Sequence, residues 1–124
     1  MENALDLLSL SADHYQRAAA RAQQGDGAAV GRASLSRVNE ELLHAERALT
    51  DRNGLPGRPW FKHQLYAPGF YTGYGVKTIP AVREAIEQKQ WGLAEQSIQN
   101  VAKVLEGESA AIERAADDLD HASK

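Results

Sequence analysis

Apolar side chains recur at steps of three and four residues along much of the chain, the spacing of one face of an α-helix. In residues 3–24 this face consists of Leu5, Leu8, Ala12, Tyr15, Ala19 and Ala22. In residues 28–51 it consists of Leu35, Val38, Leu42, Ala45 and Leu49. The pattern predicts two long amphipathic helices, and the short Gly25-Asp26-Gly27 link between them predicts that they run antiparallel.

Two further helices are predicted in the second half of the chain. The first covers residues 79–89, with Pro80 in its first turn, where the missing N–H costs nothing. Trp91-Gly92 marks the next corner, and a helix over residues 93–120 carries the stripe Ile98, Val101, Leu105, Ile112 and Leu119. Glu108 interrupts that stripe, and Gly107 beside it predicts a bend or a close helix contact. The predicted fold is all-α, a single domain over residues 1–124 forming an up-and-down four-helix bundle.

Residues 52–78 differ sharply in composition from the helices around them. They contain three of the four prolines and every aromatic ring of the chain except Tyr15 and Trp91. Prolines and glycines oppose helix formation, so this segment is predicted to be a long irregular loop, with a short strand at residues 61–66. Long loops inside compact domains are usually functional or disordered, and the aromatic content of this one argues against disorder.

Composition narrows the possible functions. The net charge of −3 is spread over both signs without a basic block, which excludes a typical nucleic-acid binder. There is no cysteine, so thiol chemistry and disulfides are excluded. No apolar run approaches the roughly 18 residues of a membrane span, and the first residues lack the pattern of a signal peptide. We therefore expect no membrane contact from this segment, and the compartment stays open.

Stand-alone catalysis is not predicted either. No histidine has a second ligand at metal-binding spacing in the sequence, so no metal site and no cofactor are expected; the four are His14, His44, His63 and His121. The serines of the predicted helices lack the Gly-x-Ser-x-Gly turn of an exposed nucleophile. Gly73-Tyr74-Gly75 follows no strand of a βαβ unit, which argues against a dinucleotide site.

The loop is the remaining candidate for function. Its aromatic rings are interleaved with the cations Arg58, Lys62, His63 and Lys77, a combination that suits an anionic small molecule or a peptide carboxylate. Other side chains of the loop are expected to cover the core instead, namely Trp60, Phe61 and Leu65. Tyr74 lies between two glycines that give it little to pack on, so we expect it to be functional.

Residues 53–68, Asn-Gly-Leu-Pro-Gly-Arg-Pro-Trp-Phe-Lys-His-Gln-Leu-Tyr-Ala-Pro, resemble a specific family. The segment is similar to the transferrin receptor-like dimerisation domain, found at the C-terminus of glutamate carboxypeptidase II and related M28 peptidases. The similarity continues through Tyr74 to Ile79-Pro80. It implies a helical domain that pairs two subunits as a homodimer and lends its long loop to the substrate pocket of the parent's peptidase domain.

The resemblance also implies roles for individual residues. In family members that prefer C-terminal glutamate, a Lys-Tyr pair of this loop holds the terminal carboxylate of the peptide substrate. Tyr74 matches the tyrosine, but Gly73 stands where the lysine would be, and Lys77 is a candidate to supply the lost charge. His63 matches a family histidine close to the pocket. The residues expected to shape the loop are Arg58, Trp60, Tyr66, Gly73 and Gly75.

The same resemblance places the chemistry elsewhere. The two zinc ions and the acid-base glutamate of such peptidases belong to a protease domain that this chain does not contain, so no catalysis is expected from the isolated chain. The related transferrin receptor keeps the architecture without peptidase activity, which leaves the parent's activity open. The alternative is a stand-alone helical binding or adaptor protein that uses the aromatic loop for a small anionic ligand or a peptide.

Overall fold

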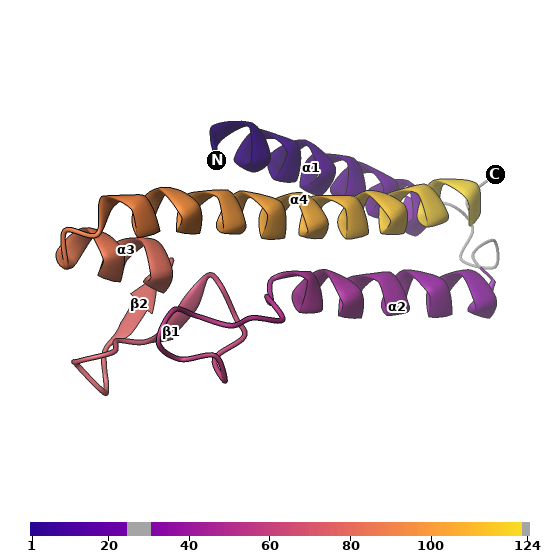
Figure 1. Ribbon diagram of the computed structural model, residues 1–124. Coiled ribbons are helices and arrows are strands. Elements are labelled where there is room, and N and C mark those ends of the chain that lie inside the picture. Colours follow the sequence, from indigo (N-terminus) through magenta and orange to yellow (C-terminus); the bar gives the residue numbers. More distant parts are fainter. Residues whose placement is uncertain (25–30, 123–124) are drawn as a thin grey trace. The chain divides into compact units, whose positions relative to one another are not determined.

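The computed structural model describes residues 1–24 and 31–122, which form four helices and one small sheet (Figure 1). The elements are α1 (Glu2–Gln24), α2 (Arg32–Ala48), β1 (Tyr66–Pro68), β2 (Val76–Thr78), α3 (Pro80–Glu87) and α4 (Trp91–Ala122). The broad all-α class is confirmed. The predicted Gly25-Asp26-Gly27 turn and the predicted helix start at residue 28 lie outside the described residues. Within those residues, no helix combines the length and the apolarity needed to cross a membrane.

The chain divides into two compact units that both include part of α4. The helical unit consists of α1, α2 and α4 from Leu105 onward. The loop unit runs from Leu49 to Val104 and includes β1, β2, α3 and the first part of α4, together with Met1. Since α3 is grouped with the loop rather than with α1 and α2, the predicted up-and-down bundle of four helices is not confirmed.

The helical unit is packed largely through small side chains. Its core residues are Ala18, Val38, Ala115, Ala116 and Leu119, with Tyr15, Ala19, Ala22 and Leu42 partly buried against them. Along α1, the polar partners on α4 advance in the same direction, from Ser11 with Ser109 to Arg21 with Asp120. Along α2 they run the opposite way, since Glu41 pairs with Arg114 and Ala48 faces Gly107. Helix α1 is therefore parallel to this part of α4, and α2 is antiparallel to it.

The predicted stripe of α1 is partly confirmed, because Tyr15, Ala19 and Ala22 are partly buried against the core. The fully buried residues are Ala4, Ser11 and Ala18, whereas Leu5 of the predicted stripe is 50% exposed. The hydroxyl of Ser11 is paired with that of Ser109 at 2.7 Å, so a polar contact adds to the small side chains where α1 meets α4. On α2 the prediction holds better, because Val38 and Ala45 are both buried.

The predicted ends of α3 and α4 are partly confirmed. Helix α3 runs from Pro80 to Glu87 rather than over residues 79–89, and Pro80 lies in its first turn as expected. Helix α4 begins at Trp91 rather than at residue 93. Lys89 forms the corner before α4 and has a φ of 58°. Two backbone hydrogen bonds close the end of α3, from Lys89 N–H to the Ile86 carbonyl and from Gln90 N–H to the Ala85 carbonyl. This is the pairing of a Schellman helix end, so Gly92 is not needed for the turn.

Glu108 gives the helical unit a pH dependence of known sign. Burial, and secondarily the charge of Glu46, raise the pKa of Glu108 above its usual value of 4.5. The charged form of Glu108 therefore destabilises the fold. This destabilisation is absent below pH 4.5 and develops as the pH rises from there through the raised pKa. We expect Glu108→Gln to raise the melting temperature at pH 7 and to leave it unchanged near pH 4. Circular dichroism melts at both values test this, with the exposed Glu106→Gln as control. An equal gain at both pH values would contradict the assignment.

Gly107 lies within the continuous helix α4, where no steric need for glycine is present. A methyl group added there would lie 3.7 Å from the Cβ of Ala48, an ordinary van der Waals distance. Since Ala is favoured over Gly in a helix by about 0.5–1 kcal/mol, we expect Gly107→Ala to stabilise the chain by that amount in urea unfolding. Gly92→Ala, in the first turn of α4 with nothing near its added methyl group, is the matched control and should gain less. A loss of stability in Gly107→Ala would show that the helices are closer than this geometry implies.

Candidate functional site

The first half of the loop folds back on itself through backbone hydrogen bonds. Asp51 N–H donates to Lys62 and Gln64 N–H donates to Leu49, each at 2.9 Å. Closer to the tip of this turn, Leu55 N–H donates to Phe61. Phe61 is partly buried against Leu55, Ala67 and Ala81, as the sequence predicted for this ring. Residues 49–64 are therefore an ordered turn with its own small apolar core.

The second half of the loop is a short hairpin. Strand β1 pairs antiparallel with β2, and the partners are Tyr66 with Thr78, Ala67 with Lys77 and Pro68 with Val76. The strand predicted at residues 61–66 is thus wrong except for its last residue, because the backbone of residues 61–64 pairs within the first turn instead. Residues 69–75 connect the strands, closed by a hydrogen bond from Gly69 N–H to the Gly75 carbonyl at 2.9 Å. Tyr74 lies on this connection.

Arg58 ties both halves of the loop to α3. It is 5% exposed and donates to both carboxylate oxygens of Glu84, at 2.9 and 2.8 Å, and to the carbonyl of Pro68. The same carboxylate accepts the N–H of Phe70 at 2.8 Å. The rings of Phe61 and Phe70 lie 5.5 and 5.4 Å from the guanidinium carbon, within the range of cation–π attraction. A loop with little regular secondary structure is fixed in this way by one buried ion pair.

The sequence did not identify Glu84, the partner that makes this arrangement possible. It lies on the buried face of α3 beside Pro80, Ala81 and Ala85. The sequence signal for Glu84 is a carboxylate on a small, apolar helix face. Such a face is expected to be buried, and buried charges are almost always paired. Arg58 was predicted to shape the loop, and in the structure it is the residue that pairs with Glu84.

Several rings of the loop are exposed to solvent. The exposed fractions are 70% for Trp60, 52% for Tyr66, 45% for Phe70, 78% for Tyr71 and 104% for Tyr74. The expectation that Trp60 covers the core is therefore wrong, because Phe61 and Leu55 already fill that position. Phe70 and Tyr71 contact each other edge to face, with ring centroids 4.9 Å apart. So much exposed aromatic area on a fixed backbone is typical of a surface that another protein segment covers.

The three residues expected at a substrate are not brought together in this chain. Tyr74 projects into solvent. Lys77 is paired through its ammonium group with Glu87 of α3, which lowers the pKa of that carboxyl group. The rings of His63 and Tyr66 are in contact, with centroids 3.9 Å apart. His63 Nδ1 accepts a hydrogen bond from the N–H of Leu65. Its buried Nε2 has no hydrogen-bond partner among the described residues.

The two glycines beside Tyr74 differ in their roles. Gly73 has a φ of 62°, the left-handed region that glycine enters freely, and a side chain added there would meet nothing within 4 Å. Gly75 supplies the carbonyl that closes the connection between the strands. The cations of the loop are engaged as well, since Arg58 binds Glu84, Lys77 binds Glu87 and the ammonium group of Lys62 donates to Arg52 O at 2.6 Å. The loop thus presents aromatic rings more than free positive charge.

Comparison with known proteins agrees with this architecture. A family model described as the transferrin receptor-like dimerisation domain matches residues 1–119. A protein of Arabidopsis thaliana named probable glutamate carboxypeptidase LAMP1 is 41% identical over 85 residues, which is 68% of this chain and 12% of that protein. A probable glutamate carboxypeptidase of Arthroderma benhamiae is 44% identical over 41 residues, 33% of this chain and 6% of that protein.

A third relative is named differently. The Schizosaccharomyces pombe protein named inactive zinc metalloprotease C354.09c is 28% identical over 72 residues, 58% of this chain and 9% of that protein. The chain spans about a tenth of the length of these relatives or less. Since the family model covers nearly the whole chain, and the loop carries the residues on which the resemblance was noted, the chain belongs to the transferrin receptor-like dimerisation domain family.

Proposed function

We propose that this chain is the C-terminal dimerisation domain of a glutamate carboxypeptidase-like zinc metallopeptidase. It pairs two subunits and lends the loop of residues 52–78 to the substrate pocket of the parent's peptidase domain. Family membership and the names of the relatives support this proposal. The zinc ions and the acid-base glutamate are supplied by the peptidase domain, so the isolated chain has no peptidase activity with or without added zinc.

The observation that carries the pocket contribution is the contrast between an ordered backbone and exposed rings. Arg58 and Glu84 fix the loop at its base, while Tyr74 at its end has no cover. A fixed loop reduces the entropy lost on binding, which is how pre-organised surfaces gain affinity. Tyr74 contacts the terminal carboxylate of the peptide substrate through its hydroxyl group.

Specificity for C-terminal glutamate depends on the missing lysine. With Gly73 at that position, the nearest candidate for a replacement charge is Lys77, which is paired with Glu87. The side chains of Lys77 and Glu87 are 15% and 48% exposed, so Lys77 exchanges a partly exposed carboxylate for that of the substrate when it turns to the pocket. Lys77 supplies the positive charge of the pocket once the peptidase domain covers the loop.

Kinetics of the full-length protein test the role of Tyr74. Tyr74→Phe removes one hydrogen bond to a charged group, worth about 1.5–3 kcal/mol, so we expect KM for peptides to rise at least about tenfold with a smaller change in kcat. Tyr71→Phe, which changes another exposed ring on the same connection, is the matched control and should leave both constants unchanged. Unchanged kinetics in Tyr74→Phe would remove the pocket contribution.

A gain of specificity tests the same site from the opposite direction. The Cβ of a lysine at position 73 would meet no atom within 4 Å, although the φ of 62° strains this residue by about 1–2 kcal/mol. Gly73→Lys is expected to raise kcat/KM for peptides ending in glutamate relative to peptides ending in leucine. Lys77→Ala should lower the same ratio in the natural protein and matter less in the Gly73→Lys variant. A ratio unaffected by either change would show that the loop does not read the terminal residue.

Homodimerisation is supported by apolar side chains left exposed in the helical unit. Helix α1 exposes Leu5, Leu7 and Leu10, and α2 exposes Leu35 and Leu43, each by 46% or more. Exposed leucines at this density are a common feature of subunit interfaces. Sedimentation equilibrium of the chain measures the stoichiometry, and a strictly monomeric chain up to high micromolar concentration would contradict pairing through this domain alone.

A further inference from the structure

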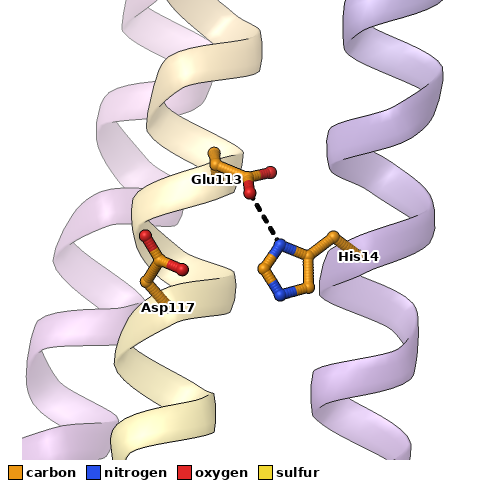
Figure 2. Close-up of side chains that lie close together, drawn as sticks. All are labelled: His14, Glu113 and Asp117. Carbon is orange, nitrogen blue, oxygen red and sulfur yellow. Dashed lines mark hydrogen bonds and ion pairs between the residues drawn. The ribbon is translucent and has the colours of Figure 1, made fainter.

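A group of polar side chains joins α1 to α4 in the helical unit, away from the residues used above. His14 of α1 places Nδ1 at 2.7 Å from Glu113 Oε1 and Nε2 at 3.1 Å from Asp120 Oδ2 (Figure 2 shows the first contact). Because carboxylates only accept hydrogen bonds, the ring must donate from both nitrogens. His14 is thus an imidazolium in this arrangement, and its pKa is raised by the hydrogen bonds to Glu113 and then Asp120.

A second carboxylate of α4, that of Asp117, lies near the same ring. Asp117 lies one helical turn after Glu113, and Figure 2 shows the Glu113 carboxylate directed at His14 and the Asp117 carboxylate in front of α4, farther from the ring. The ligand atoms that His14, Glu113 and Asp117 offer all lie within 4.8 Å of one another. One imidazole nitrogen and two carboxylate oxygens form a donor set that suits zinc and related divalent transition metals. Tetrahedral zinc, with bonds near 2.0 Å, needs ligand atoms roughly 3.3 Å apart, so only small side-chain shifts are required.

The far side of the ring supports the same interpretation independently. Metal-binding histidines almost always donate their second ring N–H to a carboxylate, which fixes the tautomer and the orientation of the ring. Here Nε2 faces Asp120, and Arg21 holds that carboxylate with hydrogen bonds of 2.6 and 3.2 Å. The hydrogen bond to Asp120 therefore occupies Nε2, and Nδ1 is the nitrogen on the side of Glu113 and Asp117.

We propose that His14 Nδ1, Glu113 and Asp117 form a binding site for one divalent transition metal ion, with Asp120 and Arg21 orienting the histidine. The metal takes the place of the proton on Nδ1, and that proton leaves to solvent. Water completes the coordination, since the three side chains are half-buried or exposed. The bound ion cross-links α1 to α4 and so stabilises the helical unit. This inference does not rest on the proposed peptidase role.

Zinc binding to the metal-free chain, measured by isothermal titration calorimetry at pH 7.5, tests the site. We expect one zinc ion per chain, at least about tenfold weaker binding in Asp117→Asn, and a larger loss in His14→Ala. Asp117→Asn leaves the contact between His14 and Glu113 in place, so circular dichroism should show an unchanged fold. Because zinc competes with a proton on His14, the affinity should also fall at pH 5.

Two histidines of the same unit serve as controls. His44 and His121 are exposed, and each uses Nδ1 to contact the backbone carbonyl four residues earlier in its own helix. Replacing either with Ala is expected to leave zinc affinity unchanged. The NMR signals of the His14 ring should shift on addition of zinc, while those of His44 and His121 do not. Affinity that survives in both His14→Ala and Asp117→Asn, or that is lost in a control variant, would overturn the proposal.

Discussion

Replacing Arg58 with Met is expected to destabilise the loop unit by about 3–5 kcal/mol, the usual effect of removing one partner of a buried ion pair. The substitution leaves the Glu84 carboxylate charged in a site where its side chain is 11% exposed. It also removes the hydrogen bond to the Pro68 carbonyl and the guanidinium between the rings of Phe61 and Phe70. Glu84→Gln is expected to have a similar effect, because the charge of Arg58 then stays buried without its counterion.

Hydrogen exchange measured by mass spectrometry locates this effect. In Arg58→Met, the hydrogen-bonded amides of residues 54–79 should lose protection, while those of α1 and α2 keep it. The matched control is Arg83→Met on α3, whose pair with Glu87 is at the surface and contributes about 0–1 kcal/mol. A double variant, Arg58→Met with Glu84→Gln, should be less destabilised than the sum of the single changes. Equal effects in Arg58→Met and Arg83→Met would mean that burial of the pair adds nothing.

Gly54→Ala is the second change with a large expected effect. Gly54 has a φ of 70°, and a methyl group added to it would lie 2.3 Å from the carbonyl oxygen of Pro59 and 2.8 Å from that of Phe61. Left-handed strain of about 1–2 kcal/mol combines with overpacking of about 1–3 kcal/mol. We expect a total loss of about 2–5 kcal/mol in urea unfolding, because backbone atoms cannot give way as a flexible side chain does.

Gly73→Ala separates the two contributions to that loss. Gly73 has a similar φ of 62° but open space around it, so only the strain of about 1–2 kcal/mol applies. Equal losses in the two variants would show that the turn at Gly54 relaxes to admit a side chain. If Gly54→Ala loses more, the first half of the loop is held by its close backbone approach. Peptide hydrolysis by the full-length protein carrying the same substitutions gives a second measurement. There, Gly54→Ala should reduce activity through loss of the loop.

The helices illustrate how far sequence pattern reaches. The three-four spacing located all of them, and Pro80 marked the start of α3, because helical periodicity and the missing N–H of proline act locally. The same spacing placed Leu5 in the buried stripe of α1 and missed Ser11, since a Ser11–Ser109 contact spans 98 residues and leaves no periodic signal. The start of α4 was misplaced for a local reason, because Lys89 adopted a conformation that glycine usually provides.

By itself, the sequence determined the helical class, the position of the aromatic loop and the family, through periodicity and a motif that lies within one short segment. Only the tertiary structure decided what holds the loop and what surrounds His14. The Arg58–Glu84 pair joins residues 26 positions apart, and His14 meets Glu113 across 99 positions. Such contacts depend on which faces of the helices pack together. The spacing of residues within each helix does not determine that packing. The spacing of possible ligands in the sequence therefore predicted no metal site. The packed helices nevertheless bring three donor side chains close together.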